Sequence, residues 1–140
     1  MAQAVSEAGM MRALRALLSE GETIEAAVYC LFKSTGFFAR SSGIMIGYVG
    51  ITDRDRLIGQ REGLLSESSF ALELRDLQKV KISGTLFGQK SVHLIFFSEK
   101  KKEVKFQAAS RVYGANLPNQ ENNLRILLER LEEKRAALSN

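Results

Sequence analysis

Residues 119–138, NQENNLRILLERLEEKRAAL, decide the fold class, because they place one long helical pattern after a series of short alternating segments. Asn119 is a suitable helix cap, and the acidic Glu121 is favourable in the first turn. The apolar stripe of the expected helix consists of leucines at helical spacing: Leu124, Leu127, Leu128, Leu131 and Leu138. The seven-residue spacing from Leu117 to Leu138 also occurs in coiled coils, but these need several sustained heptads. We therefore favour an amphipathic helix that docks on its own sheet.

The segments before this helix alternate between apolar and polar residues, which is typical of strands with one buried face. We expect strands over 23–33, 44–51, 56–62, 70–74, 79–82 and 92–97, and a seventh that begins at 104–106. Residues 52–55 are expected to form a hairpin turn and 100–102 a charged hairpin tip. Gly47 within a strand indicates curvature or a close backbone approach. Successive strands followed by one helix predict an α+β fold, a half-closed barrel with the helix over its open end.

Composition and length indicate a single soluble domain. The chain has 140 residues, of which 45% are hydrophobic and 26% charged. Residues 4–19 show helical spacing and precede Gly21, so an N-terminal helix is expected there. Cys30 is the single cysteine and the first residues lack the pattern of a signal peptide, so we expect a cytoplasmic location. A net charge of +4 allows contact with anionic lipid or nucleic acid without requiring either.

Three short motifs resemble those of bacterial pleckstrin-homology-like domains, in particular the YokE-like and GRAM-type members. These are LSEGETI at 18–24, GITDRDRLI at 50–58 and FALELRDLQKV at 70–80. The resemblance covers residues 18–138 and implies a partly open barrel of about seven antiparallel strands in two near-orthogonal sheets. It divides the chain into an N-terminal helix over 1–20 and a pleckstrin-homology-like domain over 21–140, capped by the C-terminal helix.

The loop over 33–40 carries the candidate binding residues, which are Lys33, Phe37, Phe38 and Arg40. Two adjacent phenylalanines at a loop tip, flanked by cations, are suited to an anionic membrane surface or to a pocket on a protein partner. The resemblance places Lys33 and Arg40 at two positions of the family's phosphoinositide site. Residues 44–49 contain no Lys or Arg, so high-affinity headgroup binding is not expected. The alternative is structural, with one ring packed inward and the other covering a neighbouring strand.

Other polar residues are interpreted as structural. Lysines gather in the second half of the expected sheet, and protection of an edge strand is favoured over phosphate binding: Lys79, Lys81, Lys90, Lys100, Lys101, Lys102 and Lys105. His93 is expected to be a surface or half-buried structural residue, and Cys30 a small core residue. Asp53 and Asp55 are expected in a turn, since a calcium loop needs more oxygen ligands.

These patterns favour a non-enzymatic module that associates with a protein partner or with further copies of itself, without a cofactor or metal. One alternative is a peripheral binder of anionic membranes, which would lie at the inner membrane face and use the 33–40 loop. Another is a small-ligand carrier that uses the barrel interior. The expected inward positions are Val, Leu, Ile and Phe, which fill such a space. We do not expect binding to nucleic acid, because the aromatic residues near the lysines follow core-like alternation.

Overall fold

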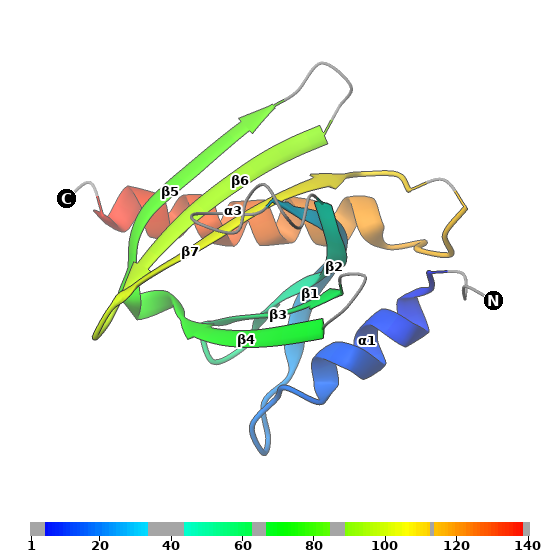
Figure 1. The fold of residues 1–140 in the computed structure, drawn as a ribbon, viewed down its shortest axis with the longest axis horizontal. Helices are drawn as coiled ribbons and strands as arrows, with labels where there is room; N and C mark the ends of the chain where they lie inside the picture. Colours follow the sequence, from blue (N-terminus) through cyan, green and yellow to red (C-terminus); the bar gives the residue numbers. More distant parts are fainter. Residues whose placement is uncertain (1–4, 34–43, 63–66, 85–88, 113, 139–140) are drawn as a thin grey trace.

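The computed structural model describes residues 5–33, 44–62, 67–84, 89–112 and 114–138, and shows a bent sheet with two helices against it (Figure 1). The elements are α1 (Glu7–Arg15), β1 (Ile24–Lys33), β2 (Ile44–Thr52), β3 (Arg56–Glu62), β4 (Glu67–Glu73), the 3₁₀ turn η2 (Leu74–Asp76), β5 (Leu77–Gly84), β6 (Gln89–Phe97), β7 (Lys101–Ala109) and α3 (Gln120–Leu138). The prediction of an α+β fold with seven antiparallel strands is confirmed.

The seven strands form one sheet in the order β4-β3-β2-β1-β7-β6-β5. β1 joins its two halves, because it pairs with β2 along its length but with β7 only at Leu31–Gln107 and Phe32–Phe106. The two outermost strands, β4 and β5, follow each other in the sequence and are linked by η2. They are the two edges of the sheet, so the barrel is not closed.

The C-terminal helix covers the concave side of the sheet, as the leucine pattern predicts (Figure 1). Leu124, Leu127 and Leu131 of α3 are buried in the same core cluster as Phe32 and Phe106. Leu128 is partly buried against this cluster. The prediction for Leu138 is wrong, since it is 45% exposed at the last turn of the helix.

Helix α1 packs on the opposite face of the sheet, where Met10 and Leu14 form a second core with Ala27 and Ile58. β1, in the middle of the sheet, is therefore covered by a helix on each face. The helix is shorter than the predicted 4–19. Its N-terminal limit is set by Ser6, which has an extended backbone and accepts a hydrogen bond from the Gly9 N–H through its Oγ at 3.1 Å.

The other turn predictions are largely confirmed. Asp55 lies in the turn between β2 and β3 with a positive φ of 56°. A Cβ atom at Gly47 would lie 1.9 Å from the Gln60 carbonyl oxygen, so the expected close approach of two backbones is present. The hairpin tip predicted at 100–102 lies closer to the N-terminus, because Lys101 and Lys102 belong to β7 and pair with Phe97 and Phe96 of β6. Their side chains are exposed, and an exposed side chain does not prevent the backbone from pairing. Among the described residues, neither helix has the length and hydrophobicity needed to cross a bilayer.

Candidate functional site

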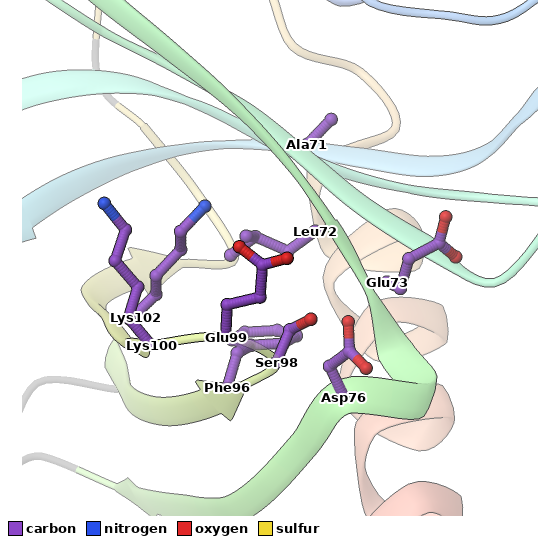
Figure 2. Close-up of a pocket in the computed structure, with 9 residues that line it drawn as sticks. All are labelled: Ala71, Leu72, Glu73, Asp76, Phe96, Ser98, Glu99, Lys100 and Lys102. Atoms are coloured by element: carbon purple, nitrogen blue, oxygen red, sulfur yellow. The ribbon is translucent and has the colours of Figure 1, made fainter.

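The open side of the sheet contains a hollow between β4 and the hairpin that joins β6 to β7. Its volume is about 230 Å³, and its walls include Leu72 of β4, Asp76 of η2, and Glu99 and Lys102 of the hairpin. Figure 2 shows the Glu99 carboxylate and the Leu72 side chain facing the same space, with Lys100 and Lys102 extending beside them. Charged side chains of both signs therefore surround an apolar floor.

A second hollow of about 550 Å³ continues this space along β4. It shares Ala71, Leu72 and Lys102 with the first, and adds Arg61 of β3 and Ser69 of β4. We call the two hollows together the β4 groove. Because it follows β4 from Ser69 to Glu73, its length suits an extended segment of a few residues.

Arg61 occupies an unusual position in the β4 groove. Its guanidinium carbon lies 5.8 Å from the ring centre of Phe32 and 5.4 Å from that of Phe70, which are cation–π distances. The Nε atom is buried and has no hydrogen-bond partner among the described residues. The side chain as a whole is half-buried and lines the groove, so its guanidinium charge can attract an anionic group from outside the chain.

The sequence prediction missed Arg61 and interpreted Lys102 as protection of an edge strand, whereas β7 lies inside the sheet. The alternation contained a signal for both residues. On β3, Arg61 faces the same side as the buried Leu57. On β7, Lys102 faces the same side as the buried Val104 and Phe106. Each cation therefore stands at an inward position near a strand end.

The predicted loop residues are only partly within the structure. Lys33 is the last residue of β1 and is exposed. Phe37, Phe38 and Arg40 lie outside the described residues, so the expected cluster stays a prediction.

A buried ion pair beside α1 has a structural role. Both oxygens of Glu22 accept hydrogen bonds, from Arg56 at 2.5 and 2.9 Å, Thr52 Oγ1 at 2.6 Å and the Ser19 N–H at 2.9 Å. The hydrogen bond with Arg56 is the main cause that lowers the Glu22 pKa to about 2. The Arg56 guanidinium also donates to the Leu17 carbonyl at 3.1 Å. This network joins the α1–β1 connection to the β2–β3 turn.

His93 is half-buried on the outer face of the sheet, as predicted, and its Nε2 lies 2.8 Å from Glu103 Oε2. Hydrogen bonds, first with His93 and then with Lys101, lower the pKa of Glu103.

The remaining residues that the sequence analysis singled out have structural positions. Lys79 and Lys81 are exposed on the edge strand β5, which agrees with their predicted role in protecting an edge. Cys30 is buried in the core, and this burial raises the pKa of its thiol. Within the described part of the chain, no three His, Cys, Asp or Glu side chains are grouped for metal binding.

Comparisons with known proteins reveal similarity of structure. No protein-family model and no curated protein matches the sequence. The hSac2 domain from the human phosphoinositide phosphatase Sac2 aligns with a TM-score of 0.57 at 12% identity, over 94% of this chain and 81% of that one. The C-terminal domain of an unknown protein from Leishmania infantum aligns with a TM-score of 0.52 at 15% identity, over 90% of this chain and 97% of that one. At such identities the likeness establishes a shared sheet-rich fold.

Proposed function

We propose that the chain is a non-enzymatic binding module of pleckstrin-homology-like fold, which associates with a protein partner at the β4 groove. The fold assignment is supported by the order of strands and by the narrow junction between β1 and β7, which divides the sheet into the two halves that such a fold would orient nearly at right angles. The position of α3 over the core supports it too.

The observation that carries the proposed function is the contrast between a filled interior and a hollow edge. Apolar side chains from the strands and α3 occupy the concave side, among them Phe32, Phe96 and Phe106. They fill the space that a small-ligand carrier would use. The β4 groove lies instead at the surface, beside a sheet edge, with a partly apolar floor and charged rims. This combination suits recognition of another polypeptide.

The test is site-specific photo-crosslinking in the native cells. A crosslinking side chain at Ala71, an exposed residue of the edge strand β4 that borders the groove, is compared with one at Ala136, which is exposed on α3. We expect a discrete adduct with one protein from Ala71 and none from Ala136. Light scattering of the purified chain at several concentrations shows whether that protein is a second copy. Absence of an adduct specific to Ala71 would refute association at the groove.

A second candidate function is peripheral binding to anionic membranes. It is favoured by Lys33, which is exposed where β1 leads into the segment with Phe37, Phe38 and Arg40. Vesicles of phosphatidylserine and phosphatidylcholine should then sediment the chain at low salt, and pure phosphatidylcholine should not. The double variant Phe37→Ala/Phe38→Ala should weaken this binding. Equal recovery with both kinds of vesicle would exclude the membrane function.

A further inference from the structure

β4 is an edge strand with part of its backbone unpaired. It pairs with β3 in an unbroken register from Glu67 to Glu73. The Leu74 N–H donates to the Asp55 carbonyl at 2.9 Å in continuation of this ladder. Because hydrogen-bonded and non-hydrogen-bonded pairs alternate in antiparallel ladders, the N–H and C=O groups of Ala71 and Ser69 point away from β3. Both residues line the β4 groove.

The two edges of the sheet differ in their protection. β5 carries the exposed Lys79 and Lys81, its register shifts between Leu77 and Lys79, and α3 packs against it. Charges, bulges and covering helices are the usual means by which proteins prevent pairing at an edge. β4 pairs with β3 without a register shift, and among its described side chains the only charge is Glu73 at its last position. α1 lies near Ser68 and Ser69 at its other end, but Ser69 and Ala71 are exposed. One edge is protected, and the edge beside the groove is open.

The charges of the β4 groove are distributed unevenly along the strand. Arg61 lies beside the segment that contains Ser69, whereas Glu73, Asp76 and Glu99 line the opposite end. Lys102 lines both hollows, Lys100 lines the one with Asp76, and Glu103 lines the one with Arg61. In Figure 2 the lysine side chains and the Asp76 carboxylate stand on opposite sides of Glu99. Four strand residues, a span of about 13 Å, separate the two ends. A complementary segment would therefore carry opposite charges about four residues apart.

We propose that a partner protein adds an extended segment to the sheet along β4, with an acidic side chain at Arg61 and Lys102 and a basic side chain at Asp76 and Glu99. Backbone hydrogen bonds to Ser69 and Ala71 hold this segment, and its inward apolar residues contact Phe70 and Leu72 of the floor. The inference rests on the proposed function and names the chemistry of its partner.

The probe is a displayed library of random twelve-residue peptides, selected on the full chain. We expect selected peptides with an acidic and a basic residue separated by three to five positions. Binding of a selected peptide should slow hydrogen exchange at the amides of Ser69 and Ala71 in the wild-type chain. No selection above background, or protection of amides elsewhere instead, would overturn strand addition.

Two variants test the backbone contact. Ala71→Pro removes the outward N–H at an edge position where proline is tolerated, and should weaken binding roughly tenfold or more. Ala71→Thr keeps that N–H and should bind within about twofold of wild type. Circular dichroism checks that both variants are folded. Equal affinity of Ala71→Pro and wild type would refute strand addition. A crosslink from Ala71 in cells would still support association at the groove, so the two proposals fail separately.

A second pair of variants tests the charge. Arg61→Met keeps apolar contact with Phe32 and Phe70 but removes the guanidinium, so peptides with an acidic residue should bind roughly tenfold less tightly. Lys81→Met removes a charge from the protected edge and should leave the affinity unchanged. If both variants weaken peptide binding equally, the loss of affinity reflects the net charge of the protein. That result would contradict the assigned orientation of the peptide. Self-association that Ala71→Pro abolishes would make a second copy the occupant, and would overturn the assignment to a partner protein.

Discussion

Gln120 on α3 binds both main-chain groups of Tyr29 on β1, although 91 positions separate them in the sequence. The Tyr29 N–H donates to Gln120 Oε1 at 3.1 Å, and Gln120 Nε2 donates to the carbonyls of Tyr29 at 2.9 Å and Ala109 at 3.0 Å. The β1–β7 register, continued from Leu31–Gln107, would place Tyr29 opposite Ala109. The buried amide thus replaces ladder hydrogen bonds where the two strands diverge.

The first prediction concerns this amide. Gln120→Leu removes the three hydrogen bonds from Gln120 to the main chain of Tyr29 and Ala109, and should lower the free energy of unfolding by roughly 3 kcal/mol. Gln78→Leu on β5 is the matched control, since Gln78 is exposed, and should change it by less than about 0.5 kcal/mol. Urea denaturation measures both. Similar values for the two variants would mean that the Gln120 side chain does not support the junction.

The second prediction is a pH dependence due to Glu22. Its pKa of about 2 in the folded chain lies below the ordinary value of 4.5, mainly because of the hydrogen bond with Arg56. The ionised carboxylate therefore stabilises the fold above pH 4.5, and this stabilisation is lost as the pH falls toward 2. Glu22→Gln should cost roughly 3 kcal/mol at neutral pH, because it leaves Arg56 without its ionic partner.

The measurement is denaturation of wild type and Glu22→Gln between pH 7 and pH 2. The difference in unfolding free energy should stay constant down to about pH 4.5 and then shrink. Glu20→Gln, at an exposed position close by, is the control and should show a much smaller difference. A constant difference for Glu22→Gln over the whole range would contradict the assignment.

The third prediction concerns Asp55, which combines a turn conformation with ion pairs to α3. Its φ is 56°, and its carboxylate pairs with Arg130 and with Lys134, the latter at 3.2 Å. Asp55→Asn keeps a side chain that tolerates this backbone and loses only the charge, so the expected loss is about 1 kcal/mol or less. Asp55→Ala loses the charge and adds roughly 1 kcal/mol of backbone strain. Thermal unfolding of both variants tests this order, and an equally stable Asp55→Ala would contradict it.

Much of the sheet could be predicted from local pattern, because a strand with one buried face leaves its period in the sequence. Val92, Leu94 and Phe96 alternate and are buried on β6. Leucine spacing likewise indicated which face of α3 is buried, except at Leu138, where the helix extends beyond the core. Short-range pattern is sufficient when the buried face repeats within a few residues.

The β1–β7 junction and the β4 groove depend on contacts between residues far apart in the sequence, which no local pattern indicates. The contact of Gln120 with Tyr29 requires the path of the whole chain. Arg61 and Lys102 are far apart in the sequence and meet only because β7 lies across from β4 at the open side. The predicted site at Lys33, Phe37, Phe38 and Arg40 instead lies within one continuous loop. Residues that are neighbours in the sequence can be recognised as a cluster without knowledge of the fold.

The fourth prediction connects the core to the β4 groove through Gly59 of β3. A Cβ atom there would lie 2.3 Å from Cζ of Phe70, the ring that contacts the Arg61 guanidinium. Gly59→Ala should displace this ring and lower the free energy of unfolding by about 1–3 kcal/mol. Gly84→Ala on β5 is the control, because its Cβ would meet only Lys90 Nζ, at 3.7 Å.

Replacing the Phe70 ring by a smaller side chain tests whether this ring causes the loss of stability. In the Phe70→Leu background the smaller side chain leaves room for the new methyl group, so Gly59→Ala should cost less than half of what it costs in wild type. Urea denaturation of the four chains gives the coupling between the two positions. If Gly59→Ala costs the same in both backgrounds, the loss arises from the β3 backbone and not from Phe70. The packing under Arg61 would then tolerate a larger residue than its geometry indicates.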